Sequence, residues 1–244
     1  MPVTSDVSFK AFPAFNAPQN VGFAGQRMRL NRDLVEALFP GNSLAEKIVR
    51  ALGEAKAMTL KECMESFEFF ERVRRRMRTR VMADLCCGHG LTGLLFAAFE
   101  RGVEQVYLVD RRKPASQPRL MGALLSVAPW VESKVIYLES SIAKGAAELP
   151  PGTAILGVHA CGVRTDRCTE VAVQLRGPVA VMPCCYAQTA KRAPRALVRS
   201  LGAELATDVD RTYRLQAAGY QVDWSAIPKA VSDKNRILVG IPLT

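Results

Sequence analysis

From residue 81 to the end of the chain, short apolar runs alternate with segments of helical periodicity. This alternation constrains the fold most, because repeated strand–helix units pack as a parallel sheet covered by helices on both faces. We expect an α/β, doubly wound, mostly parallel seven-stranded sheet, with room for one antiparallel strand among the last two. Strands are expected at residues 81–85, 105–109, 134–138, 154–158, 178–182, 221–224 and 237–241, and helices at residues 91–101, 118–127, 141–149, 166–175, 195–205 and 212–218.

The first 80 residues are expected to form an N-terminal extension, and residues 81–244 the main domain. Residues 1–26 show no periodic pattern and are expected to be irregular. Residues 27–80 are expected to be helical. Two S/T-x-x-E capping boxes, at Ser43–Glu46 and Thr59–Glu62, support this prediction, and the second precedes an apolar pattern of helical spacing.

The helix that the second box begins ends in a cluster of arginines. Positive side chains at a helix C-terminus are stabilised by the helix dipole, by roughly 0.3–1 kcal/mol each, so the cluster fits a solvated helix end. It also fits a surface that contacts the phosphates of RNA. The sequence leaves both interpretations open for Arg72, Arg74, Arg75, Arg76, Arg78 and Arg80.

The composition is that of an ordinary globular domain. The 244 residues are 49% hydrophobic and 23% charged, and no apolar run approaches the roughly 20 residues of a membrane span. The N-terminus lacks the pattern of a secretory signal, so a cytoplasmic location is expected, with the seven cysteines as free thiols. The net charge of +10 fits nucleic-acid binding without requiring it.

A glycine-rich turn follows the first strand, where the sequence reads DLCCGHG from Asp84 to Gly90. Glycine at a strand-to-helix turn lets the backbone turn tightly and a ligand approach closely, as in Rossmann-like folds. Asp110 ends the second strand about 20 residues further on, where an acid accepts hydrogen bonds from ribose hydroxyls. The pattern predicts a nucleoside-containing cofactor held by Asp84, Gly88, Gly90 and Asp110.

The acid at Asp84 favours S-adenosylmethionine over a dinucleotide. A carboxylate beside the turn attracts a cationic, amino-acid-bearing ligand and repels a pyrophosphate. No Tyr-x-x-x-Lys pair of the kind used in short-chain hydride transfer follows. The alternative interpretation is that Asp84 only complements the dipole of the next helix.

This turn resembles the first motif of class I methyltransferases, in which an acid precedes three alternating glycines. Cys86 stands where that motif has its first glycine. The resemblance implies that Asp84 lies near the methionine end of the cofactor and that Asp110 binds its ribose. It also implies that Ser141 and Ile142, after the third strand, border the adenine.

Cysteine and histidine residues gather where the first, fourth and fifth strands end. Ligands of open parallel sheets bind beyond the carboxyl ends of the strands, so these side chains are expected along one edge of the sheet. Adjacent strand residues point to opposite faces, so only one cysteine of each pair should face the site. The residues are Cys86, Cys87, His159, Cys161, Cys184 and Cys185.

These segments resemble a small methyltransferase subgroup, and the resemblance covers roughly residues 81–242. The subgroup contains the methyltransferase domain of glutathione S-transferase C-terminal domain-containing protein, METTL-twenty-five-like proteins and Trm-thirteen-type tRNA methyltransferases. The tRNA enzymes usually have a histidine where this chain has Tyr186. The shared residues are His159, Cys161, Gly162, Thr165 and Asp166, then Cys184, Cys185 and Tyr186, and a tail with Gly219-Tyr220, Lys234-Asn235 and Val239-Gly240-Ile241-Pro242.

A methyl-acceptor site is the functional interpretation of this edge. His159 has the intrinsic pKa of a general base, and Asp166 could orient it or touch the substrate. Cys161, Cys184 and Tyr186 would border the acceptor. The structural alternatives are a hydrogen-bonded His159 at a strand end and an Asp166 that complements the helix dipole beside an N-cap at the preceding threonine.

A metal site is not expected here. Thiolates and imidazole are zinc ligands, but no C-x-x-C spacing is present, and free cysteines also serve as small apolar packing residues.

The sequence therefore predicts an S-adenosylmethionine-dependent methyltransferase of unknown acceptor. RNA, including tRNA, is the first choice because of the net charge, the arginine cluster and the partial resemblance to a tRNA enzyme. The first alternative is a small-molecule, thiol or metalloid methyltransferase. The second is a non-catalytic module that binds the cofactor or a dinucleotide and contacts a partner.

Overall fold

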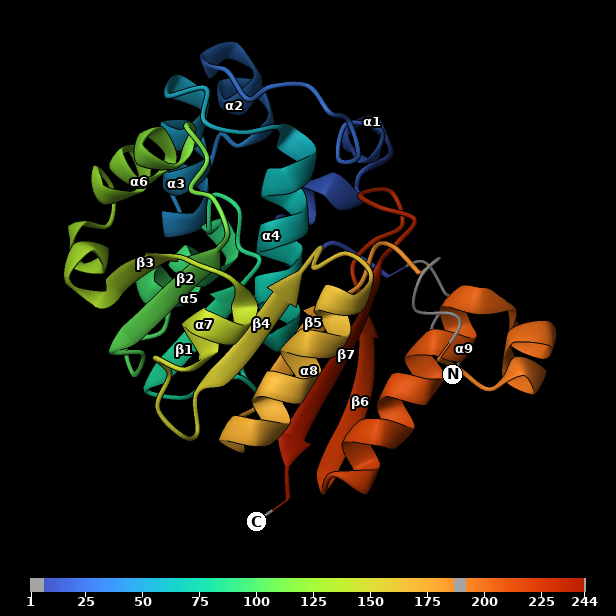
Figure 1. Cartoon of the computed structure of the whole chain (residues 1–244). Helices are drawn as coiled ribbons and strands as arrows, with labels where there is room; N and C mark the ends of the chain where they lie inside the picture. The colour runs from blue at the N-terminus through green and yellow to red at the C-terminus, as the bar shows by residue number, and fades with distance from the viewer. Residues whose placement is uncertain (1–6, 187–191, 244) are drawn as a thin grey trace.

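A seven-stranded sheet forms the centre of the protein in a computed structural model that describes residues 7–186 and 192–243 (Figure 1). The order is β3-β2-β1-β4-β5-β7-β6; β1 to β5 are parallel, and β7 is antiparallel to both neighbours. The predicted sheet with one antiparallel closing strand is confirmed. Its strands are β1 (Val81–Leu85), β2 (Gln105–Asp110), β3 (Val135–Glu139), β4 (Ala154–Val158), β5 (Val179–Met182), β6 (Tyr220–Ala226) and β7 (Arg236–Pro242).

Helices cover both faces of the sheet, as expected for a doubly wound fold. Successive strand residues point to opposite faces, so in β1 Met82 joins one hydrophobic cluster while Ala83 and Leu85 join the other. The main-domain helices are α5 (Leu91–Phe99), α6 (Gln117–Leu125), the 3-10 helix η2 (Pro129–Lys134), α7 (Ile142–Ala146), α8 (Val163–Leu175) and α9 (Arg195–Ala217).

Helix α9 differs from the prediction of two helices at residues 195–205 and 212–218. Residues 195–217 are helical apart from a kink at Gly202, where φ is +78° and ψ is 161°. Glycine reaches this backbone conformation without a Cβ clash, so the chain bends there and then resumes the helix. None of the described helices is both long and apolar enough to cross a membrane.

The N-terminal segment is helical earlier than predicted. Within residues 1–26, expected to be irregular, the 3-10 helix η1 (Pro13–Asn16) and helix α1 (Pro18–Val21) each begin at a proline, whose fixed φ suits a first helical turn. Both capping boxes form, with Ser43 and Thr59 as reciprocal N-caps. The helices that follow are α2 (Arg32–Leu38), α3 (Leu44–Glu54) and α4 (Leu60–Val73).

Aromatic side chains join this N-terminal segment to the main domain. The ring of Phe12 lies 5.0 Å from Phe67 of α4, and Phe70 of α4 lies 4.9 Å from Phe96 of α5, edge to face. All four belong to the hydrophobic cluster that covers one face of the sheet. Residues on both sides of the predicted boundary at residue 80 therefore belong to one hydrophobic core.

Five of the six arginines at the end of α4 are paired with acids, whereas Arg75 is exposed and forms no ion pair with the described residues. Arg72, only 4% exposed, pairs with Glu68, and Arg74 pairs with both Glu71 and Glu100. The three further pairs are Arg76–Asp223, Arg78–Glu100 and Arg80–Glu104. These pairs hold the helix end against the main domain, and the predicted contact with RNA stays a prediction.

Glu68 of α4 binds the backbone of the N-terminal segment through hydrogen bonds. We predict that substituting this residue lowers the stability of the folded protein. Its buried carboxylate accepts hydrogen bonds from the backbone of Lys10 and Ala11 and pairs with Arg72. Glu68→Ala removes the acceptor of two backbone amides and the charge partner of the nearly buried Arg72 side chain, so the free energy of unfolding in urea should fall by about 3 kcal/mol. The control Glu71→Ala, which removes a partly exposed ion pair of the same helix, should cost no more than about 1 kcal/mol. Equal losses in the two variants would contradict this role.

Candidate active site

The turn between β1 and α5 has the left-handed backbone of a glycine-rich loop. Cys86, Gly88 and Gly90 have φ values of +59°, +55° and +82°. A Cβ on Gly90 would lie 2.6 Å from Leu108 of β2, so this position needs glycine for close packing as well. Cys86 adopts the glycine-like conformation despite its side chain, which is uncommon for a non-glycine residue. The departure from the glycine motif therefore leaves the turn intact.

Two aspartates hold this turn by accepting hydrogen bonds from its backbone. Asp110, at the end of β2, accepts from the Gly88 amide at 2.9 Å, and Asp84, at the end of β1, accepts from the Gly93 amide at 3.0 Å. Asp84 is 2% exposed. Burial raises its pKa to about 7, against the Gly93 hydrogen bond and together with the negative charge of Asp110.

The larger of two adjoining cavities, of about 860 Å³, opens beyond the carboxyl ends of the strands. Its volume lies within the range of small-molecule and cofactor sites. Residues from five segments line it: Cys86 after β1, Asp110 at the end of β2, Ser141 and Ile142 at the start of α7, His159 after β4, and helix α8. The structure thus brings four of the predicted cofactor residues, Cys86, Asp110, Ser141 and Ile142, together at one cavity.

The smaller cavity, of about 180 Å³, is lined by Asp84, Gly88 and His89 and by two acids of α4, Glu62 and Glu65. Cys86 and His159 line both cavities, so the two meet at these residues. Gly90 lines neither of these two cavities, and it packs closely against Leu108 of β2 instead.

His159 meets a carboxylate that the sequence did not indicate. Its Nε2 lies 2.9 Å from Oε2 of Glu65, off the direction of a linear hydrogen bond. Glu65 is buried and also pairs with Lys61. Burial favours its neutral form, but His159 and Lys61 hold the pKa of Glu65 below its ordinary value. His159 has a φ of +57°, a second uncommon backbone conformation at the junction of the cavities.

Asp166 lies elsewhere, in a buried ion-pair network. It pairs with Arg211 at 2.8 Å, Arg214 at 3.2 Å and Arg192 at 3.4 Å. Thr165 is not the N-cap of α8: the helix begins at Val163, and the Thr165 hydroxyl donates to the carbonyl of Ala160. The carboxylate that the structure brings beside His159 is that of Glu65, while Asp166 pairs with arginines.

Tyr186 belongs to the same network. Its buried hydroxyl donates to Asp208 at 2.9 Å, and Asp208 also pairs with Arg211 and Arg236. Burial and the charge of Asp208 raise the pKa of Tyr186. Arg211 thus joins Asp166 to Tyr186 through buried charges, and both residues stabilise the loops around the site. Their direct contact with an acceptor stays a prediction.

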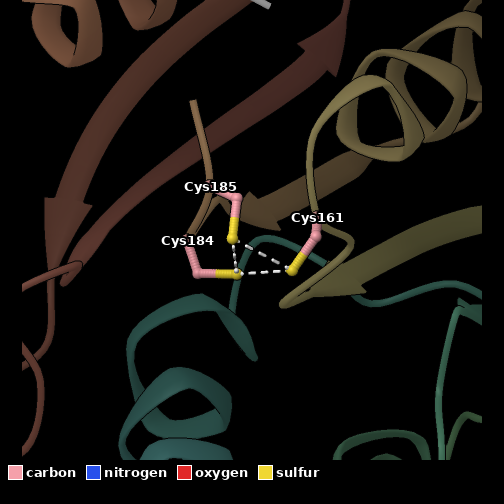
Figure 2. A group of neighbouring side chains, drawn as sticks. All are labelled: Cys161, Cys184 and Cys185. Carbon is pink, nitrogen blue, oxygen red and sulfur yellow. Dashed lines mark hydrogen bonds between the residues drawn. The ribbon is translucent and has the colours of Figure 1, made fainter. Parts of the chain in front are cut away.

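Three cysteines meet where the loops after β4 and β5 lie side by side (Figure 2). The sulfur of Cys161 lies 2.9 Å from that of Cys184 and 3.4 Å from that of Cys185, and the last two are 3.6 Å apart. The prediction that only one cysteine of this pair faces the site is wrong. Strand β5 ends at Met182, so Cys184 and Cys185 lie outside the extended backbone and no longer alternate. We call these three residues the thiol cluster.

Sequence reasoning missed the residues that the N-terminal helices and the strand-end loops add to the cavities. Glu62 and Glu65 lie on α4, where Glu62 belongs to the capping box, and no sequence signal connects either acid with β1 or β4. Arg111 and Arg164 line the larger cavity. Arg111 directly follows the strand-end acid Asp110, and Arg164 lies within the predicted His–Cys motif. These positions were a signal that could have identified both arginines.

The fold of the chain is similar to that of a solved methyltransferase structure. A protein of Klebsiella pneumoniae assigned as an O-methyltransferase superposes with a TM-score of 0.50 at 12% sequence identity, over 87% of this chain and 96% of that protein. The resemblance predicted from the sequence is thus confirmed at the level of the fold. No protein-family model matches the chain.

The sequence is similar to that of glutathione S-transferase C-terminal domain-containing protein. The Xenopus laevis protein is 23% identical over 201 residues, which cover 66% of this chain and 31% of that protein. The mouse protein is 25% identical over 201 residues, with 66% and 30% covered. The chain therefore matches about a third of the length of these relatives.

The raised pKa of Asp84 predicts a stability that falls as the pH rises. The carboxyl has a pKa near 3.8 in the unfolded chain and about 7 in the folded protein. Between these pH values the folded protein binds a proton that the unfolded chain has lost, so the free energy of unfolding falls as the pH rises. Between pH 5 and pH 8 this single group should lower the free energy of unfolding by about 2–3 kcal/mol.

Unfolding in urea at the two pH values tests this. Asp84→Asn should remove that part of the pH dependence, whereas Asp233→Asn, at an exposed loop position, should keep it. An unchanged pH dependence in Asp84→Asn would show that another group titrates in this range.

Proposed function

We propose that the protein is an S-adenosylmethionine-dependent methyltransferase. The observation that carries this proposal is the pair of joined cavities at the carboxyl edge of a methyltransferase-type sheet. The carboxylate of Asp110, at the end of β2, faces the larger cavity, and acids surround the smaller one. S-adenosylmethionine has a ribose, a sulfonium and an ammonium group, and it lacks the pyrophosphate that acids would repel.

Each end of the cofactor has a chemically suitable partner. Asp110 is positioned to accept hydrogen bonds from ribose hydroxyls, with Ser141 and Ile142 beside the adenine in the same cavity. The ammonium group of the methionine end is suited to the smaller cavity, where Asp84, Glu62 and Glu65 supply negative charge. The methyl group would then lie near the junction of the two cavities.

His159, which borders that junction, is suited to act as a general base. When a hydroxyl acceptor attacks the methyl group, the oxygen–carbon bond forms, the sulfur–carbon bond breaks, and the hydroxyl proton passes to the imidazole. Glu65, 2.9 Å from Nε2, would stabilise the imidazolium, as a buried carboxylate does for a catalytic histidine. Holding acceptor and methyl group together supplies most of the remaining rate enhancement.

RNA is the acceptor that we propose. The exposed Arg111 and Arg164 line the larger cavity, and the chain has a net charge of +10. Arg167, also in the lining, is neutralised by Glu170, whereas no ion pair joins Arg111 or Arg164 to an acid within the described part of the chain. A cationic sulfonium cofactor gains nothing from these guanidinium groups, so they favour an anionic acceptor.

We predict that S-adenosylhomocysteine binds at micromolar concentration in calorimetric titration and that NADH does not. Asp110→Ala removes both the ribose acceptor and the hydrogen bond to Gly88, so binding should weaken by about tenfold or more. The control Glu104→Ala removes an exposed acid next to the other end of β2, paired with Arg80, and should bind like the unchanged protein. A preference for NADH would overturn the cofactor assignment.

We also predict salt-dependent binding of tRNA, with methyl transfer from radiolabelled S-adenosylmethionine. Arg164→Ala should weaken binding and lower the slope of log K against log salt by about 1. The control Arg78→Ala changes an exposed arginine that Glu100 already neutralises, and its slope should stay the same. If only Arg78→Ala changed the slope of log K against log salt, the RNA contact would lie at the end of α4. No binding at low salt would exclude RNA, and binding of both ligands without methyl transfer would favour a non-catalytic module.

A further inference from the structure

The backbone brings the three cysteines of the thiol cluster together. Cys161 follows β4, and Cys184 and Cys185 follow β5, its parallel neighbour in the sheet. Two hydrogen bonds join the loops: the His159 amide donates to the carbonyl of Met182 at 3.1 Å, and the Gly162 amide donates to the carbonyl of Cys185 at 3.2 Å. The three sulfur atoms therefore face one another before any ligand binds.

Packing does not account for these cysteines. Cysteines that serve as small apolar residues are buried, as Cys63 and Cys168 are in this protein, at 0% exposure. Cys185 is exposed, and Cys161 and Cys184 are half-buried. Three polarisable sulfur atoms within reach of solvent and of one another form a set of ligand atoms.

We propose that Cys161, Cys184 and Cys185 bind one zinc-type, thiophilic divalent cation through three thiolates. Thiolate sulfur selects such ions over magnesium or calcium. With zinc–sulfur bonds of about 2.3 Å in a tetrahedral site, the sulfur atoms would lie about 3.8 Å apart. The present separations of 2.9, 3.4 and 3.6 Å require the side chains to open by less than about 1 Å.

The fourth position of this site is open. Within the described residues, no further histidine, cysteine, aspartate or glutamate joins the group. Three protein ligands with one free position are typical of zinc sites that bind water or a substrate, whereas purely structural sites have four. On binding, each thiol gives its proton to solvent.

A bound cation would join the loop after β4 to the loop after β5. His159 lies two residues before Cys161, so the cation would also hold the histidine in its left-handed conformation beside the cavities. Cation binding by the thiol cluster requires no methyl transfer, so metal binding and methyltransferase activity can be measured independently.

Cadmium is the probe for this proposal, because its bonds to thiolates produce an ultraviolet charge-transfer band. The reduced, chelator-treated full-length protein is titrated with cadmium in the absence of air, and zinc affinity is then measured by competition with a chromophoric chelator. We expect one equivalent bound per chain. Cys161→Ser, Cys184→Ser and Cys185→Ser should each weaken binding by about a hundredfold or more.

The matched control is Cys168→Ala, which removes a buried cysteine outside the thiol cluster and should bind cadmium like the unchanged protein. Circular dichroism and S-adenosylhomocysteine titration of every variant show whether it folds, and Cys185→Ser, at an exposed position, is the least disruptive change. No stoichiometric charge-transfer band, or equal loss in Cys168→Ala, would overturn the metal site. Cadmium binding without binding of S-adenosylhomocysteine would leave it standing and overturn only the cofactor assignment.

Discussion

The hydrogen bonds that Asp84 and Asp110 accept from the turn after β1 are the interactions on which the rest of the site depends. They fix three left-handed residues and the start of α5 against the edge of the sheet. Because Asp84 is buried, its charge is costly, and the pKa is raised to about 7. The protein thus keeps a buried carboxyl group of raised pKa in the wall of the smaller cavity, as functional sites commonly do.

Helix α4 extends this arrangement to the N-terminal segment. Its Phe70 packs on α5, which the turn positions, and one turn earlier its Glu65 reaches His159 across the smaller cavity. Glu68 of the same helix holds the backbone near Lys10. Helix α4 therefore completes the wall of the smaller cavity and supplies two of its carboxylates, and the two parts of the chain share one core.

Buried ion pairs stabilise the part of the protein formed by α8, α9 and the loop after β5. Arg211 pairs with Asp166 and Asp208, and Asp208 accepts from Tyr186, so α8, α9 and the loop after β5 are joined in one network. Removing one partner would leave an uncompensated charge in the interior, which is strongly destabilising. This explains why polar residues that resemble a methyltransferase motif lie away from the cavity: they hold the loops that carry His159 and the thiol cluster.

The sequence by itself determined the sheet, the glycine turn and the gathering of four predicted cofactor residues at the larger cavity. Hydrophobic periodicity and turn chemistry are local, and the strand ends of a parallel sheet share one edge. It could not place Glu65 beside His159, since these residues are far apart in the chain and only the packing of α4 on α5 brings them together. It also misjudged Cys184 and Cys185, because the strand rule of alternating sides holds only while the backbone stays extended. Tertiary structure decided which polar residues face the cavity and which pair in the interior, since burial and pairing of charge depend on neighbours from other elements.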